Sequence, residues 1–183
     1  MAVLFDASIL LLTIQPDVPP PHDPNTGQPL KDGKQRVDYL IHKLSEEKTK
    51  IIIPTPALSE ALVYYTGEET NSIILNLQKP PFHITPFDIH AAVECAETVR
   101  DAGCRGNKTN NSRAKVKFDR QIIAIAQVEE VKTIYSDDED IYKYGTNIGL
   151  KVTRSYQLEL DPNDRQGRLA LDAVTHPTKA GLK

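Results

Sequence analysis

The chain has 183 residues, of which 39% are hydrophobic and 26% charged, and its formal net charge is −3. This length and composition predict a soluble globular protein with one domain of ordinary size and its own core. The slight negative charge excludes recognition of nucleic acid by overall charge, so such a ligand would need a local basic patch. Two cysteines without a CxxC pair exclude a disulfide framework and argue against a structural zinc site.

The amino-terminal segment is an apolar run with no basic residues before it, and Asp6 interrupts that run. This is not the pattern of a signal peptide or a membrane span, so we expect a cytoplasmic protein without membrane contact. Residues 2–5 are predicted to form a buried strand, and residues 8–13 a short helix. Residues 15–34 contain six prolines and two glycines, which block helix and central strand, so a long loop insertion is expected there.

The middle of the chain alternates between apolar strands and amphipathic helices. Residues 36–47 carry apolar side chains at helical spacing, and residues 50–53, which are apolar after Lys50, are typical of a buried parallel strand. Thr55 is predicted to cap the next helix, with Pro56 at its first position. The remaining predicted elements are, in chain order, a helix over 68–77, a strand over 82–85, a helix over 86–102, a polar loop over 105–112, a helix over 114–128, a strand over 133–135, a helix over 138–144 and a strand over 149–152.

This alternation predicts an α/β fold, namely a three-layer sandwich with a central parallel sheet flanked by helices on both faces. Residues 1–158 are expected to form this domain. Residues 159–183 have mixed charge and two prolines, and are expected to form an extended or disordered tail. The helix over 86–102 is expected to turn one apolar stripe toward the core: Ile89, Ala92, Val93, Ala96 and Val99.

Four segments far apart in the chain carry carboxylates where the ligand cleft of such a sheet would lie. Asp6 ends the first strand, and Glu60 lies early in the helix after the second. Asp119 lies on a helix rich in Ile and Ala, and the acidic run 137–140 follows the strand over 133–135. Ligands of open α/β sheets bind outside the carboxyl ends of the strands. Carboxylates that converge there repel one another unless a hard divalent cation neutralises them, which predicts a metal site.

Each of these carboxylates also has an ordinary structural interpretation. Asp6 could cap the turn that follows its strand, and Asp119 could be a favourable charge near a helix N-terminus. Glu60 lies at the edge of a buried stripe and could face solvent. The run 137–140 could be the solvated start of a helix. The metal interpretation depends on the occurrence of all four segments together.

Four sequence motifs resemble those of the PIN (PilT N-terminus) family of metal-dependent nucleases, over about residues 2–153. The opening strand Val3-Leu4-Phe5-Asp6-Ala7-Ser8 is similar to the family's first motif, an Asp followed two residues on by Ser or Asn. The helix segment Pro54-Thr55-Pro56-Ala57-Leu58-Ser59-Glu60 is similar to the second. The third and fourth motifs resemble Phe118-Asp119-Arg120-Gln121-Ile122-Ile123-Ala124 and Ile134-Tyr135-Ser136-Asp137-Asp138.

The resemblance implies roles for the acidic residues. Asp6, Glu60, Asp119 and Asp138 would be catalytic, with Asp6 as the central metal ligand. Asp119 and Asp138 would complete the ligand shell, Asp140 would be an outer ligand, and Glu60 would serve as a second ligand or as the base that holds the attacking water. Because these ligands offer only oxygen, Mg²⁺ or Mn²⁺ is expected rather than zinc.

Substrate contacts are expected from hydroxyl and cationic side chains. Ser8 and Ser136 could hold a phosphate oxygen, or Ser8 could be an ordinary turn hydroxyl. Asp137 and Glu139 are expected to face solvent. A basic patch before and around Asp119 could follow a phosphate backbone into the site, with a solvated loop and helix face as the equal alternative. The cations expected to bind substrate are Arg113, Lys115, Lys117 and Arg120.

The resemblance therefore implies an endoribonuclease that hydrolyses single-stranded RNA and leaves 5′-phosphate and 3′-hydroxyl ends. It would be either a toxin with a small antitoxin partner or a free-standing RNA-processing enzyme, and a homodimer is a further expectation. The alternative from another class is a PIN-like interaction or scaffold module without catalysis, against which the four filled acidic positions argue. An aspartyl-phosphate phosphatase would need a second Asp two residues after the first, where this chain has Ser8.

Overall fold

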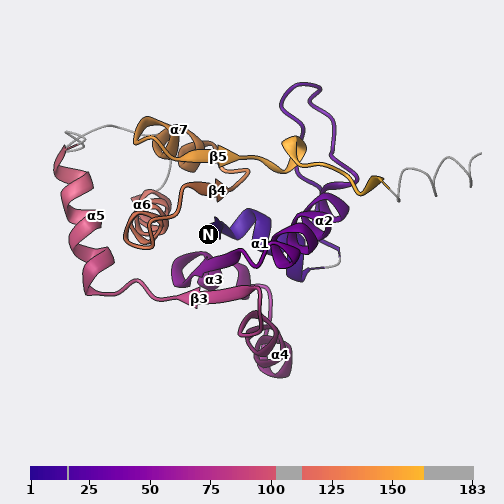
Figure 1. Cartoon of the computed structure of the whole chain (residues 1–183), viewed down its shortest axis with the longest axis horizontal. Coiled ribbons are helices and arrows are strands. Elements are labelled where there is room, and N and C mark those ends of the chain that lie inside the picture. Colours follow the sequence, from indigo (N-terminus) through magenta and orange to yellow (C-terminus); the bar gives the residue numbers. More distant parts are fainter. Residues whose placement is uncertain (16, 102–112, 163–183) are drawn as a thin grey trace, which may run out of the picture.

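A parallel five-strand sheet forms the centre of the molecule (Figure 1). The computed structural model describes residues 1–15, 17–101 and 113–162. Every neighbouring pair of strands is parallel, and the spatial order is β3-β2-β1-β4-β5. The strands are β1 (Ala2–Phe5), β2 (Lys50–Pro54), β3 (Phe82–Thr85), β4 (Thr133–Tyr135) and β5 (Lys151–Thr153).

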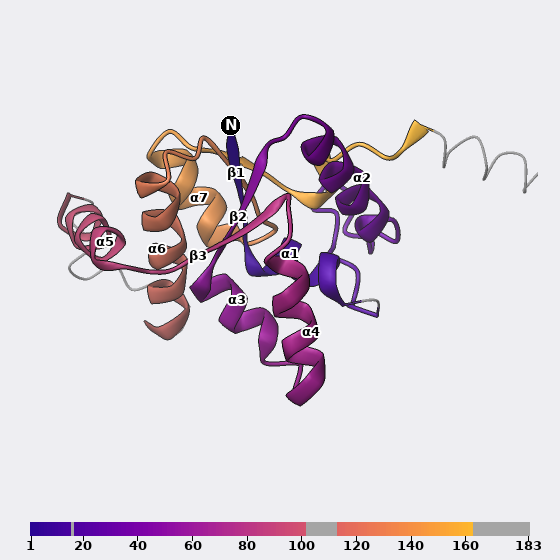
Figure 2. The same ribbon diagram turned by 60° about the horizontal axis from the view of Figure 1, so that its bottom comes forward.

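Helices cover both faces of this sheet (Figures 1 and 2), which confirms the expected three-layer α/β fold. Successive residues of a strand point to opposite faces of the sheet, so each strand contributes to both layers. Phe5 and Ile51 enter one core cluster, while Leu4 and Ile52 enter the other. Helices α1, α2, α3 and α4 contribute buried residues to the first cluster, and the second receives most of its helical residues from α6. The helices are α1 (Ala7–Ile14), α2 (Gly33–Glu46), α3 (Thr55–Leu62), α4 (Gly67–Leu77), α5 (Ile89–Asp101), α6 (Arg113–Val128) and α7 (Glu139–Asn147), with a 3₁₀ turn over Ser155–Gln157.

The strand order places a ligand crevice beside β1. The chain moves outward from β1 through β2 to β3, and then returns across the sheet to β4 on the other side of β1. The connections therefore leave β1 and β4 in opposite directions, and open α/β sheets bind ligands at such a switch point. Asp6 follows β1 directly and Asp138 lies just beyond β4, so both belong to this end of the sheet.

Helix α5 differs from its sequence prediction in both its start and its buried face. It begins at Ile89 rather than at residue 86, and the carboxylate of Asp88 accepts a hydrogen bond from the Ala91 N–H at 2.9 Å. Ile89 is 81% exposed and Val93 54%, whereas Ala91 is 1% exposed. The prediction of an inward apolar stripe was wrong, because α5 packs on α6 through a partly polar face. In this face the Thr98 hydroxyl donates a hydrogen bond to the side-chain oxygen of Gln127.

The start of α3 also corrects a local prediction. Pro54 occupies the N-cap position, so Thr55 is the first residue of the helix rather than its cap. The Thr55 hydroxyl instead accepts a hydrogen bond from the backbone N–H of Phe87 at 3.0 Å. This bond ties the start of α3 to the segment between β3 and α5.

The chain after β5 returns to α2. Leu158 is buried in the first core cluster, and the Arg36 guanidinium donates a hydrogen bond to its carbonyl. Lys43 forms an ion pair with Glu159 at 3.0 Å. Of the tail expected over 159–183, the part from residue 163 onward lies outside the described residues. The polar loop expected over 105–112 also lies outside them.

Candidate metal centre and active site

Asp6 lies at the junction of β1 and α1, and only 4% of it is exposed. It is the N-cap residue of α1, so the capping role left open by the sequence is present. One carboxylate oxygen, Oδ2, accepts hydrogen bonds from the hydroxyls of Ser8, at 3.0 Å, and Ser136, at 2.8 Å. The two serines therefore hold this carboxylate at the carboxyl end of the sheet.

The environment of Asp6 raises the pKa of its carboxyl group. Burial is the largest cause, because removal from water penalises the charged form. The negative charge of Asp138 acts in the same direction. Hydrogen bonds from Ser136, from the Ala7 backbone and from Ser8 act against this rise but do not cancel it. A nearby cation would remove this electrostatic cost.

The loop between β4 and α7 is joined to the Asp6 turn by further hydrogen bonds. The Ser136 hydroxyl, which is fully buried, accepts a bond from the Asp138 N–H at 3.0 Å. The Ser8 hydroxyl accepts a bond from the Asp137 N–H at 3.0 Å. The Asp138 carboxylate in turn caps α7, since its Oδ1 accepts bonds from the backbone N–H groups of Asp140 and Ile141.

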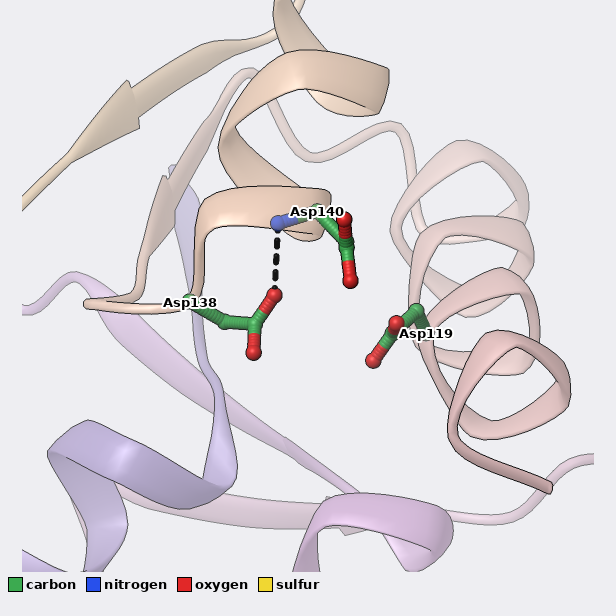
Figure 3. A group of neighbouring side chains, drawn as sticks. All are labelled: Asp119, Asp138 and Asp140. Carbon is green, nitrogen blue, oxygen red and sulfur yellow. Dashed lines mark hydrogen bonds between the residues drawn. The ribbon is translucent and has the colours of Figure 1, made fainter. Parts of the chain in front are cut away.

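Asp119 comes to the same place from α6. It is 8% exposed, and its carboxylate faces those of Asp138 and Asp140 across a small space (Figure 3). One oxygen from each of the three lies within 4.8 Å of the other two. Two oxygens bound to one hard cation, with bonds of about 2.0–2.6 Å, lie up to roughly 4–5 Å apart. The three carboxylates therefore fit a shared divalent ion.

The four carboxylates predicted to be catalytic line one cleft of about 310 Å³. Asp119 and Asp138 belong both to this cleft and to the three-carboxylate cluster, and Glu60 of α3 enters the cleft as a half-buried residue. Asp6 lines the cleft but is not a member of the cluster, so its expected role as the central ligand stays a prediction. The complete lining is Asp6, Ala7, Ser8, Leu11, Glu60, Asp119, Asp137 and Asp138.

Asp137 and Glu139, which were expected to face solvent, have different environments. Glu139 is exposed, and hydrogen bonds from Arg154 and then from Lys143 lower the pKa of its carboxyl group. Asp137 instead lines the cleft, and its carboxylate accepts a bond from the Ser155 N–H at 2.8 Å. Asp137 thus has a positioning role that a run of four acidic residues does not reveal.

The expected basic patch is only partly described. Arg113 and Lys115 lie in the first turn of α6, and their side chains fall outside the described part of the structure. Lys117 is exposed. Arg120 is half-buried and acts on Cys95 of α5, where its charge opposes the burial that raises the pKa of that thiol. Neither Lys117 nor Arg120 lines the described cleft.

Substitution of Ser136 by alanine should destabilise the fold. The change removes a buried hydroxyl that joins Asp6 to Asp138, so a buried backbone donor and a carboxylate lose a partner, at a cost of about 1–3 kcal/mol. Urea unfolding would measure the loss. Ser59→Ala is the matched control, because the exposed Ser59 hydroxyl only bonds the Pro56 carbonyl within α3. Equal midpoints for the two variants would contradict the bridging role.

The parallel sheet carries a cluster of carboxylates at its carboxyl edge, and comparison with solved structures shows that this α/β fold is PIN-like. A VapBC2 complex from Rickettsia felis, crystallised with a promoter DNA fragment, contains a chain that matches with a TM-score of 0.55 and 15% identity, over 84% of this chain and 98% of that one. A DNA-bound VapBC from Salmonella typhimurium matches with a TM-score of 0.51 and 10% identity, over 85% and 98%.

At these identities the likeness is one of fold, that of VapC PIN-domain toxins, and it confirms the structural class that the four motifs indicated. No protein-family model matches the chain, and no curated protein sequence does so significantly. None of the described helices has both the length and the apolar character that crossing a membrane requires.

Proposed function

We propose that this protein is a metal-dependent endoribonuclease that hydrolyses single-stranded RNA in the acidic cleft. The observation that carries the proposal is the approach of Asp119, Asp138 and Asp140 to within 4.8 Å of one another. Two unit charges 4 Å apart repel by roughly 4 kcal/mol at an effective dielectric constant of 20. This repulsion favours the binding of a cation among the three carboxylates.

The donor set supports Mg²⁺ or Mn²⁺ as that cation. All three ligands offer carboxylate oxygen, which hard divalent ions prefer. When bound, the ion would neutralise charge on the phosphate and lower the pKa of a water for attack on phosphorus. Asp119, Asp138 and Asp140 would hold it, and Asp6 is the fourth candidate ligand in the same cleft.

The remaining groups of the cleft have roles that follow from their places. Glu60 enters the cleft from α3 and would orient the attacking water or accept its proton. Ser8 and Ser136 keep Asp6 in place through Oδ2. Because both hydroxyls are already engaged, we assign them to positioning of the carboxylate rather than to the substrate phosphate.

A small antitoxin is the protein partner we propose. Two solved structures with this fold, from Rickettsia felis and Salmonella typhimurium, are VapBC complexes crystallised with DNA. A free-standing RNA-processing enzyme would share the cleft but would need no such partner. Co-expression with the product of an adjacent small gene, followed by size-exclusion chromatography, separates the two forms of the proposal.

Removal of the divalent ion should stop RNA cleavage. Purified protein with Mg²⁺ or Mn²⁺ should cut single-stranded RNA to fragments with 5′-phosphate and 3′-hydroxyl ends, and EDTA should reduce the rate to background. Excess Mg²⁺ should restore the cleavage rate, and this control shows that EDTA did not unfold the protein. Electrophoresis of end-labelled RNA measures both rates.

Two results would contradict the nuclease proposal. Cleavage by the purified protein that persists unchanged in EDTA would exclude a divalent ion from the reaction. Absence of cleavage together with absence of Mg²⁺ binding by calorimetry would favour the alternative, a PIN-like interaction module that has kept the fold without the chemistry.

A further inference from the structure

A second cleft lies at the other end of the sheet from the acidic site. It has a volume of about 440 Å³, against about 310 Å³ for the acidic cleft. Its lining residues lie where β2 and β3 begin and at the ends of α2 and α4. Strand β2 has 5 residues at about 3.3 Å each, so roughly 16 Å of strand separates the two ends. The residues that line it are Ser45, Lys48, Thr49, Lys50, Gln78, Pro80, Pro81, Phe82 and His83.

The charge of this cleft is opposite to that of the acidic site. Its lining includes two lysines and a histidine but no carboxylate. Within the described part of the chain, Lys48, Lys50 and His83 form no ion pair, and exposed lysines elsewhere, such as Lys132 and Lys151, form none either. A chain with a net charge of −3 therefore keeps a small group of unneutralised cations around one concave surface.

Backbone hydrogen bonds hold the walls of the cleft. After α2 the chain turns through Lys48, whose φ is +54°, and its N–H donates to the Ser45 carbonyl at 3.0 Å. The N–H of Thr49 donates to the Leu44 carbonyl at 2.8 Å. On the other wall, the Ile51 N–H donates to the Pro81 carbonyl at 2.9 Å. The lining side chains are therefore carried on a rigid frame rather than on an extended loop.

A simpler explanation covers only one of these cations. Helix C-termini carry partial negative charge, and lysines near them are common for that reason. Lys48 lies just beyond the end of α2 and fits this explanation. Lys50 and His83 lie on β2 and β3, and the pairing of Ile52 with His83 places both on the same face of the sheet. No helix end accounts for these two.

We propose that this basic cleft binds the phosphate of a nucleotide, either a free mononucleotide or one unit of a single-stranded RNA. Ammonium, imidazole, hydroxyl and amide groups supply the donors that a phosphate needs. Pro80, Pro81 and Phe82 supply an apolar wall against which a base can lie. The volume is in the range of about 300–1,000 Å³ usual for small-molecule sites. This proposal does not depend on catalysis in the acidic cleft.

Calorimetric titration with AMP in EDTA tests the site, because EDTA prevents a metal-mediated phosphate contact in the acidic cleft. Wild-type protein should bind one AMP, with inorganic phosphate weaker and adenosine weakest. The double variant Lys48→Ala/Lys50→Ala should bind AMP at least about tenfold more weakly and with a smaller salt dependence. The matched control is Lys132→Ala/Lys151→Ala, which removes two exposed lysines at the starts of β4 and β5 and should bind as wild type does.

The outcomes separate this proposal from the nuclease proposal. AMP binding should survive Asp119→Asn, and the Lys48/Lys50 variant should still cleave a short RNA with Mg²⁺. Competition by a ten-nucleotide RNA for the AMP site would identify chain nucleotides as the ligand, and failure to compete would identify free nucleotides. Absence of AMP binding by the wild type would overturn the proposed phosphate site. So would an AMP affinity in the Lys48/Lys50 variant equal to that of the wild type, together with a lowered melting temperature. The favourable charge of a lysine near the end of α2 would then be the explanation of Lys48.

Discussion

Asp119→Asn should reduce RNA cleavage by at least about 10²–10³-fold, the scale expected when one stabiliser of the transition state is removed. Asp119 reaches the cluster from α6, while Asp138 and Asp140 both come from the start of α7. Asp119 is therefore the member of the three-carboxylate cluster that comes from a second helix. Asparagine keeps the size of the side chain but removes the charge that attracts the cation, so Mg²⁺ affinity measured by calorimetry should fall together with the cleavage rate.

The control for this change is Asp38→Asn. Asp38 lies on the exposed face of α2, where it pairs with Lys34, and the change alters the net charge by the same amount. This variant should cleave RNA at the wild-type rate. Full activity of Asp119→Asn, with the fold verified by circular dichroism, would remove the acidic cluster from the mechanism. Loss of activity in both variants would show that overall charge rather than the cleft is responsible.

Asp6→Asn should abolish cleavage and yet raise stability at neutral pH when no divalent ion is present. Burial, assisted by the charge of Asp138, raises the pKa of Asp6 above its ordinary value of 3.8. A raised pKa means that the folded state binds this proton more tightly than the unfolded state does. The ionised group therefore lowers stability as the pH rises from the ordinary pKa through the raised one, and asparagine escapes that loss.

The hydrogen bonds of Asp6 need not be lost in this variant. An asparagine oxygen can still accept from Ser8 and Ser136, and asparagine is among the best N-cap residues for α1. Urea unfolding in EDTA should give a higher midpoint for Asp6→Asn than for wild type at pH 7, and the difference should vanish below the ordinary pKa of an aspartate. A lower midpoint at pH 7 would mean that the serine hydrogen bonds to the charged carboxylate outweigh its burial.

Added Mg²⁺ should make the wild type more stable than Asp6→Asn, which reverses the order of their urea midpoints. The ion binds the folded wild type and neutralises the carboxylates, so its midpoint should rise with ion concentration. Asp6→Asn has lost one charge of the cleft and should gain less. If Mg²⁺ raised both midpoints equally, Asp6 would be excluded as a contributor to ion binding, and Asp119, Asp138 and Asp140 would hold the ion without it.

Local patterns were sufficient for most of the strands and for the order of the elements. The apolar runs at residues 2–5 and 51–53 form most of β1 and β2, because strand positions buried between two helical layers need apolar side chains. Alternation with helices then required parallel strands, and parallel strands bring their carboxyl ends to one edge of the sheet. The meeting of Asp6, Glu60, Asp119 and Asp138 in one cleft could be predicted for this reason.

Other features depended on contacts between segments that no local pattern contains. The inner face of α5 was decided by α6, which accepts the polar Thr98 and leaves Ile89 exposed. The roles within the acidic run were decided by neighbours, since Ser155 engages Asp137 while Arg154 engages Glu139. The basic cleft joins the ends of α2 and α4 to the starts of β2 and β3.

The sequence by itself therefore determined the layers, the parallel direction of the strands and the acidic edge, because these follow from periodicity and from the geometry of parallel strands. The tertiary structure alone decided which oxygens lie close enough to share an ion and which cations remain unpaired. Those properties depend on distances of a few ångströms between side chains from different elements, and hydropathy along one segment carries no information about such distances.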